Sequence, residues 1–399
     1  MCGIICVVSR PSARPLPLAV DILDALDRAI AIAAQGNVAE AGRLVAQADI
    51  ALRGEAGLGT LIDNFALVSG LISRIDQLDA LALDAEAQLE SESGLSTREV
   101  ERRSNEMIAL RDATWSLRND RLRTAKAVGE LAGKDASASA RNAYFSIQQA
   151  FSALDRMEVR GRDSAGVHVL VWGHGLDATD KRVASLLAGR LDDALFTNGS
   201  VRVGAGNRAW SFVYKAAAEI GELGDNTRAM RAAVASDALL RLLVSQPNAR
   251  VSILGHTRWA SVGIISEPNA HPVNSEEVGG TATAPYMLAA LNGDVDNHAD
   301  IKVRNGLHIA DPITTDAKVI PTVVARKHAA GLSFTDAFRE TVAEFEGSVA
   351  IAVANADEPN TMMLALRGSG QGLYVGIAED RFIVASEPYG VVEETLQYV

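Results

Sequence analysis

The sequence has few cysteines and no cluster of metal ligands. It contains two cysteines in 399 residues, too few for a disulfide framework. Cys2 and Cys6 lie four positions apart on an expected strand, which separates them too far for a disulfide. The seven histidines do not join these cysteines at the spacing of a zinc site. We therefore expect no structural zinc, no cofactor and a reducing, cytoplasmic setting.

Positive charge is also scarce. Lys and Arg number 38 against 50 Asp and Glu, which gives a net charge of −12 and a pI of about 5.1. This balance argues against a nucleic-acid or anionic-membrane surface. No apolar run is long enough to span a bilayer, and the start of the chain lacks the order of regions of a signal peptide. Nucleic acid and membrane are therefore not expected partners.

The chain changes character twice. Residues 2–8 (CGIICVV) predict a buried strand, which the three prolines of RPSARPLP end. Residues from about 18 to 133 are rich in Ala, Leu, Glu and Arg, with apolar residues three and four apart, and predict long amphipathic helices. Thr97 is the expected cap of the last long helix. These helices could pack only on one another, or they could form a partner-docking or oligomerising arm.

The second half of the chain is rich in short apolar runs separated by turn residues. It predicts strands and helices in separate segments, which is the α+β class. A helical stretch is expected between residues 209 and 246. The expected strands cover 165–172, 251–255, 287–291, 347–354, 362–366, 373–377 and 382–385, and further helices are expected over 139–157, 318–330 and 333–345.

Cys2 is the first candidate for chemistry. A thiol attacks as the thiolate, and a free cysteine has a pKa near 8.5. If Met1 is removed, the α-amine of Cys2 becomes a base within the same residue and can take the thiol proton. The alternative is a half-buried strand cysteine with no chemical role. The motif CGII alone does not decide between these two interpretations.

Three later motifs carry groups that such a nucleophile needs. GHTRWASVG at 255–263 supplies Arg258, whose guanidinium can bind a planar carboxylate at two points. LNGDVDNH at 291–298 supplies the Asn292 amide and the Gly293 N–H, which are donors of the kind that an oxyanion hole needs. Asp316 in TTDAKV could cap the following helix or bind a substrate ammonium.

Together these motifs resemble those of a known family. The matching pieces are CGI at 2–4, RGRDSAG at 160–166, GHTRWAS-G at 255–263, EPNAHP at 267–272, NGDVDNH at 292–298, TTDAKVI at 314–320, and EGSVAIAVANADEPNTMMLALRGS followed by FIVASEP. In order and spacing they are similar to class II glutamine amidotransferase domains, above all the glutaminase domain of glutamine–fructose-6-phosphate aminotransferases. The resemblance covers the first dozen residues and most of 143–399.

The resemblance implies a catalytic role for three residues. Cys2 would be nucleophile and base, and it would form a γ-glutamyl thioester with the glutamine side chain. Asn292 and Gly293 would hold the oxyanion. Ammonia would leave first, and water would then release glutamate.

The resemblance also implies roles in binding the substrate L-glutamine. Arg258 would bind its α-carboxylate with help from Ser261, and Asp316 would bind its α-ammonium. Trp259 would lie beside the pocket, and Arg160 would help to position the terminal amine.

The implied fold is the four-layer αββα sandwich of N-terminal-nucleophile hydrolases with a large helical insertion. Its domains would be 1–14 with 141–399 for the glutaminase, and 15–140 for the insertion. Sugar-phosphate isomerase domains are absent from this chain, so the ammonia acceptor, which the family analogy implies is a sugar phosphate, would be bound by another domain or chain. The family also suggests a homo-oligomer.

Five positions depart from the family pattern. It usually has Thr at Ser261, His at Val262 and Leu291, and Tyr at Val159 and Arg162. The changes at Val262 and Leu291 motivate a second hypothesis, in which the pocket senses glutamine, with little or no catalysis, and the helices bind a partner. A third is a related amide hydrolase for another substrate, which the Arg258 and Asp316 pair disfavours.

Overall fold

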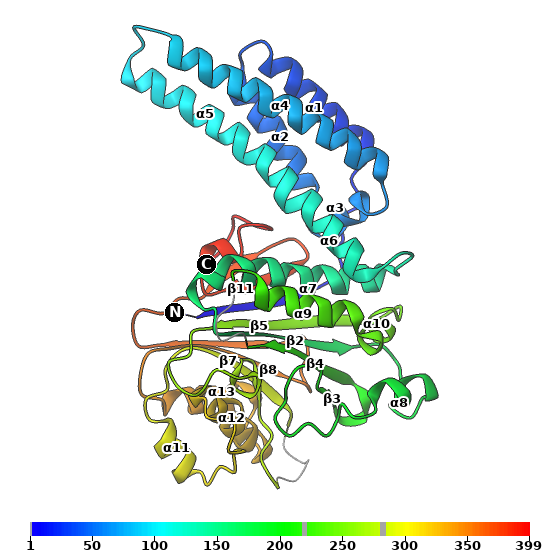
Figure 1. The fold of residues 1–399 in the computed structure, drawn as a ribbon, viewed down its shortest axis with the longest axis vertical. Helices are drawn as coiled ribbons and strands as arrows, with labels where there is room; N and C mark the ends of the chain where they lie inside the picture. The colour runs from blue at the N-terminus through cyan, green and yellow to red at the C-terminus, as the bar shows by residue number, and fades with distance from the viewer. Residues whose placement is uncertain (1, 218–221, 280–284) are drawn as a thin grey trace. The chain divides into compact units, whose positions relative to one another are not determined.

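The computed structural model describes residues 2–217, 222–279 and 285–399 (Figure 1). The chain divides into two compact units, Met1–Arg10 with Leu131–Val399, and Pro11–Glu130. The helical unit is therefore inserted after the first strand of the other unit. Each unit is described by itself.

The helical unit packs long amphipathic helices against one another. Its elements are α1 (Ala19–Ala33), α2 (Val38–Ala51), α3 (Gly54–Leu61), α4 (Phe65–Ser91), α5 (Thr97–Ser116), the π-helical turn Leu117–Leu122 and α6 (Arg123–Ala132), the last of which crosses the boundary between the units. One stripe of α4, which includes Leu71, Ile75 and Leu78, is fully buried, and α4 packs on both α1 and α5. The cap of α5 is Ser96, whose hydroxyl accepts the N–H of Glu99, so the expectation of Thr97 was wrong by one residue.

None of the described helices alone is long and apolar enough to cross a membrane. By length and composition only, α3 and α4 pass that test together as a pair that is bent by 101°.

The larger sheet of the other unit has seven antiparallel strands. Its order is β10-β11-β1-β5-β2-β4-β3. The bounds are β1 (Gly3–Ser9), β2 (Ser164–Trp172), β3 (Val201–Val203), β4 (Ala209–Ala216), β5 (Arg250–Arg258), β10 (Tyr374–Ile377) and β11 (Arg381–Ala385). Strand β1 thus lies inside the sheet, between β11 and β5, with Gly3 opposite Thr257.

The smaller sheet has four antiparallel strands in the order β6-β7-β8-β9. They are β6 (Val273–Asn274), β7 (Met287–Gly293), β8 (Val349–Asn355) and β9 (Met362–Arg367). Strand β7 ends at Gly293, where it pairs with Val349 of β8. The expected α+β class is confirmed, with antiparallel sheets and a helical region.

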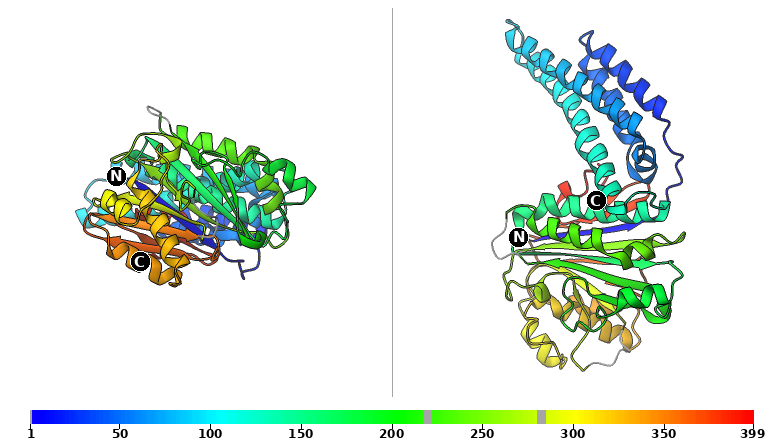
Figure 2. Two further views of the ribbon diagram at one scale, coloured as in Figure 1. Left: turned by 90° about the horizontal axis from the view of Figure 1, so that it is seen from below. Right: turned by 45° about the vertical axis from the view of Figure 1, so that its right-hand side comes forward.

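The two sheets lie face to face with helices on their outer sides, as Figures 1 and 2 show. Apolar side chains from both sheets, such as Cys6, Leu254 and Leu288, form one buried cluster between them. The larger sheet is covered by α7 (Ala138–Met157) and α9 (Asp225–Ser236), which contact its strands. The smaller sheet packs on α12 (Val319–Ala329) and α13 (Phe334–Ala343). The remaining helices are α8 (Lys181–Leu187), α10 (Ala238–Val244) and α11 (His298–Arg304).

The prediction of a helical stretch from 209 to 246 was wrong at its start. Residues Ala209–Ala216 (AWSFVYKA) form β4, and the next helix in the described part of the chain, α9, begins at Asp225. Aromatic residues at every second position pack better on a pleated sheet than on a helix. Trp210, Phe212 and Tyr214 are all buried, so sheet packing decides the conformation.

Two lysines are buried between the layers of this unit. Lys318 donates to the backbone and side-chain oxygens of Asn274, at 2.6 and 2.8 Å. The Nζ of Lys215 has no hydrogen-bond partner among the described residues and lies 5.1 Å from the centre of the Phe196 ring. Burial lowers the pKa of each lysine to about 7, and the charge of Lys318 contributes at Lys215.

Lys215→Met is expected to stabilise the protein at pH 7. The pKa of Lys215 is about 7 in the fold against an ordinary 10.5, so the unfolded chain binds more protons between these values. The free energy of unfolding should therefore increase with pH across that window. Below the window, the buried charged lysine costs a few kcal/mol of stability, at about 1.4 kcal/mol per pKa unit. Urea unfolding at pH 7 and pH 9.5 should show a smaller pH dependence for this variant. The exposed Lys302→Met is the control; a less stable Lys215→Met at pH 7 would contradict the argument.

Candidate active site

Cys2 immediately precedes β1, and its side chain lies beside the end of β5. The backbone N–H of Trp259 donates to its Sγ at 3.2 Å, and Sγ lies 3.5 Å from the Trp259 carbonyl oxygen. The next residue must be glycine for this approach. A Cβ on Gly3 would lie 2.8 Å from both the Met157 Cβ and the Thr257 Oγ1. Sequence-distant segments thus meet at the thiol.

The surroundings of Cys2 favour a protonated thiol at rest. Burial raises the pKa of Cys2, and the nearby Asp294 carboxylate adds to this. The Trp259 N–H and the Arg258 guanidinium act in the opposite direction but are weaker than burial. Attack by this sulfur therefore requires a base that removes the proton.

Asn292 is fixed against Cys2 from the end of β7. Its Nδ2 donates to the Cys2 carbonyl oxygen at 2.9 Å. On its other side, the His256 Nε2 lies 2.8 Å from the Leu291 carbonyl oxygen and 3.1 Å from Asn292 Oδ1. Burial lowers the pKa of His256 to about 3, so the ring is neutral, and two oxygens at Nε2 require the proton to be there. His256 therefore sets the orientation of the Asn292 amide. One of the two N–H groups of Asn292 Nδ2 is then left for a ligand.

Gly293 has a conformation that other residues rarely adopt. Its φ is 84°, and a Cβ would lie 1.8 Å from the Ser348 carbonyl oxygen. Only glycine fits at this point. Its backbone N–H follows Asn292 directly, so the two donors predicted from the sequence are adjacent.

Arg258 is a buried cation without an ion-pair partner in the described part of the chain. It is 2% exposed, and its Nη atoms donate to the carbonyl oxygens of Val262 and Ile264. Burial lowers its pKa although Cys2 and Asp316 lie near enough to oppose the shift. Two of its five N–H groups are used, so it can still bind an anion.

Asp316 supplies a buried negative charge that interacts with Arg258. It is 4% exposed and accepts the N–H of Val295 at 2.7 Å, and no cation pairs with it among the described residues. Burial raises its pKa, and Asp294 adds to this through charge repulsion. The buried Asp316 carboxylate and the buried Arg258 guanidinium, both without an ion-pair partner among the described residues, are together suited to a zwitterionic ligand.

Trp259 and Ser261 lie at the rim. Trp259 is 60% exposed, and Ser261 is exposed and donates from its hydroxyl to the Asp294 carboxylate. The backbone of Arg160 lies in a short 3₁₀ turn, Glu158–Arg160, but its side chain is outside the described part of the structure. No group of three or more His, Cys, Asp and Glu side chains that could hold a metal ion occurs in the described ranges.

Three residues of the site had no role assigned from the sequence. Asp163 accepts the Ala260 N–H at 2.7 Å, His256 orients Asn292, and Asp294 holds Ser261. All three lie within the motifs quoted above, and that location is the feature of the sequence that could have identified them. His271 of the EPNAHP motif is buried, and its Nε2 lies 3.0 Å from the Thr315 hydroxyl oxygen.

Comparison with known proteins gives the same assignment as the motifs. Part of the chain is 32% identical over 162 residues to a glutamine–fructose-6-phosphate aminotransferase (isomerizing) of Bacillus thuringiensis, which covers 41% of this chain and 26% of that protein. The enzyme of the same name from Geobacillus kaustophilus is 35% identical over 161 residues, 40% of this chain and 25% of that protein. Over this part of its length, the chain is similar to class II glutamine amidotransferase domains.

The chain matches these relatives over part of their length only. The similar segment spans about a quarter of each curated relative. No family model matches the chain. A glutamine phosphoribosylpyrophosphate amidotransferase from B. subtilis aligns in structure with 63% of this chain and 42% of its own, at 19% identity and a TM-score of 0.38. This TM-score is too low to establish a shared fold.

Proposed function

We propose that this protein hydrolyses L-glutamine to glutamate and ammonia, with Cys2 as an N-terminal nucleophile. The observation that carries the proposal is the environment of Cys2. Its sulfur accepts the Trp259 N–H while its carbonyl oxygen holds the Asn292 amide, so nucleophile and oxyanion donor are fixed to each other.

The reaction has two stages. In the first, the amine of Cys2, freed by removal of Met1, takes the thiol proton as Sγ attacks the side-chain carbonyl carbon of glutamine. The Asn292 amide and the Gly293 N–H hold the oxyanion, the amine returns the proton to the leaving nitrogen, and ammonia departs. In the second, water attacks the γ-glutamyl thioester, glutamate leaves and the thiol is restored. Atoms and charges balance without a cofactor.

Binding of glutamine uses the two unpaired buried charges. The Arg258 guanidinium takes the α-carboxylate, and the Asp316 carboxylate takes the α-ammonium. Ser261 and Trp259 complete the pocket at its rim, and Arg160 would help to position the terminal amine. This pairing supports a free amino acid rather than a peptide amide, because a peptide bond would remove one of the two charges.

The ammonia would serve an acceptor bound elsewhere. We assign the glutaminase to residues 1–14 and 141–399, with the layered α+β unit as an N-terminal-nucleophile sandwich, and the helices of 15–140 to an insertion. The curated relatives are named for fructose-6-phosphate, so a sugar phosphate held by another domain or chain, in a homo-oligomer, is the proposed acceptor.

The proposal is tested by incubating the purified protein with glutamine and measuring glutamate release. Glutamate and ammonia should appear in equal amounts. If the protein binds glutamine but releases no glutamate, with or without an added fructose 6-phosphate-binding partner, the enzymatic proposal fails and a sensing role replaces it.

Asp316→Asn is expected to weaken glutamine binding. The amide keeps an acceptor for the Val295 N–H but loses the charge that pairs with the α-ammonium. A hydrogen bond to a charged group contributes about 1.5–3 kcal/mol, so KM should rise about 10- to 100-fold with a smaller change in kcat. Steady-state kinetics measure this, with the exposed Asp311→Asn as a matched control. An unchanged KM would remove Asp316 from the pocket.

A further inference from the structure

One short segment lies directly behind the peptide that contacts the Cys2 sulfur. We name residues 158–163 the clamp segment. The Asp163 N–H donates to the Arg258 carbonyl oxygen at 3.2 Å, and the Asp163 carboxylate accepts the Ala260 N–H at 2.7 Å. The clamp segment thus holds the backbone on both sides of Trp259, whose own N–H points to Cys2.

The contact is closest at Gly161. A Cβ there would lie 2.7 Å from the carbonyl carbon of Arg258 and 2.9 Å from the nitrogen of Trp259. No side chain separates the clamp segment from the peptide that donates to the thiol. A displacement of this segment would therefore move the Trp259 N–H.

Helix α9 anchors the clamp segment at both ends. At one end, the Gly224 N–H, at the start of α9, donates to the Glu158 carboxylate. At the other, the Asn226 Nδ2 donates to the Arg162 carbonyl oxygen at 2.9 Å. Glu158 and Asn226 are 2% and 3% exposed, so neither contact is replaced by water at little cost.

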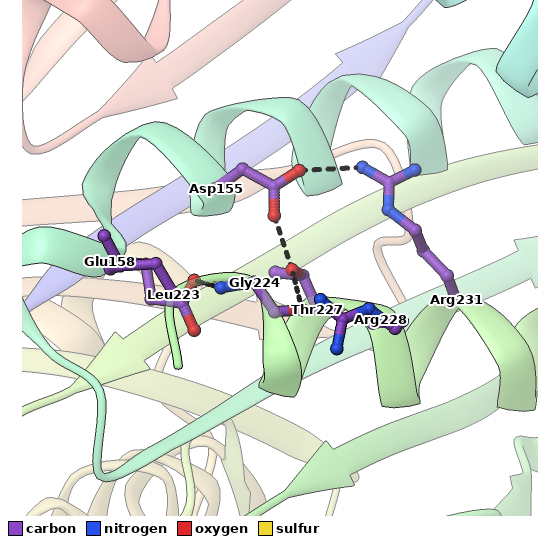
Figure 3. Close-up of a pocket in the computed structure, with 7 residues that line it drawn as sticks. All are labelled: Asp155, Glu158, Leu223, Gly224, Thr227, Arg228 and Arg231. Carbon is purple, nitrogen blue, oxygen red and sulfur yellow. Dashed lines mark hydrogen bonds and ion pairs between the residues drawn. The ribbon is translucent and has the colours of Figure 1, made fainter. Parts of the chain in front are cut away.

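Helix α9 is itself fixed to α7, as Figure 3 shows. Asp155 of α7 accepts the Thr227 hydroxyl and, at 3.0 Å, the Arg231 guanidinium. The Arg231 guanidinium also lies 4.7 Å from the centre of the Phe151 ring. The anchors of the clamp segment therefore come from a rigid element rather than from a loop.

We propose that Glu158 and Asn226 are positioning residues for Cys2: through the clamp segment they hold the Trp259 N–H on the nucleophilic sulfur. The inference rests on the proposed role of Cys2 and adds two residues that touch neither substrate nor thiol. In this proposal, α9 keeps the Trp259 N–H in contact with the Cys2 sulfur.

The experiment uses Glu158→Ala and Asn226→Ala in the full chain. The Trp259 N–H stabilises the thiolate, so its displacement should raise the pH at which Cys2 becomes reactive by about half a pKa unit or more. Alkylation of Cys2 by iodoacetamide across pH, read by peptide mass spectrometry, measures this midpoint. In the glutaminase assay, kcat should fall about tenfold or more with a smaller change in KM, as expected for a misplaced nucleophile.

Two further variants separate positioning from general damage. Arg228 lines the pocket drawn in Figure 3 together with Glu158, but its ion pair is with Asp225 of its own helix. Arg228→Ala should therefore change neither the midpoint nor kcat. Glu158→Gln keeps an oxygen acceptor for the Gly224 N–H and should recover most of the loss. Since the alkylation readout needs no turnover, it decides the inference even if glutamine is not hydrolysed.

An unshifted midpoint and kcat in a folded Asn226→Ala protein would overturn the inference. The same follows if Arg228→Ala shifts the midpoint as far as Glu158→Ala does. If Glu158→Ala does not fold, Asn226→Ala and Glu158→Gln decide the outcome.

Discussion

Replacing Cys2 with alanine is expected to abolish glutamate release from glutamine. The variant keeps the chain terminus and the backbone contact of Asn292 but has no atom that can form the thioester. Loss of a covalent nucleophile costs on the order of 10⁴-fold or more in kcat. Glutamate release in the purified variant, followed for hours at high protein concentration, is the measurement.

Cys6→Ala provides the matched control. Cys6 is fully buried in the cluster between the sheets, and burial raises its pKa far above that of a free thiol. It is therefore inert, and its removal should cost stability but leave kcat unchanged. If Cys2→Ala and Cys6→Ala lost activity equally, the loss could not be attributed to removal of the nucleophile.

Gly293→Ala is expected to disrupt the proposed oxyanion site. The new Cβ would overlap the Ser348 carbonyl oxygen, and φ of 84° disfavours any side chain, so the strand end has to move. Loss of one oxyanion donor typically lowers kcat by about 10²–10³-fold, and KM should change much less. Single-turnover kinetics with glutamine separate this chemical step from binding.

Gly36→Ala controls for backbone strain alone. Gly36 has the same φ of 84°, but nothing lies within 4 Å of its Cβ position, and it belongs to the helical unit. This variant should lose about 1 kcal/mol of stability and no activity. A Gly293→Ala protein that is folded and keeps wild-type kcat would show that oxyanion stabilisation does not depend on this turn.

Much of the candidate site could be proposed from the sequence because its polar groups lie in short motifs at strand ends. CGI, GHTRWAS and NGDVDNH each place a polar group just before or after an apolar run, so the sequence alone predicts which side chains leave the sheets. The pairing of β1 with β5 then brings Cys2 to Trp259. The α+β class followed from the separation of strands and helices along the chain.

The supporting contacts could not be predicted because they join distant segments through backbone groups. Glu158 meets the N–H of Gly224, and His256 bridges to Leu291 and Asn292 through a carbonyl and an amide oxygen. Backbone donors and acceptors are the same in every residue, so no pattern of side chains marks them. Strand β4 was missed for a related reason, since packing on β2 decides its conformation.

The most direct test of Cys2 as an N-terminal nucleophile is mass spectrometry after treatment with 6-diazo-5-oxo-L-norleucine, which mimics glutamine. We expect a chain that begins at Cys2 and carries one adduct on that residue, and excess glutamine should prevent the adduct from forming. A chain that retains Met1, or one in which Cys2 stays unmodified, would contradict it.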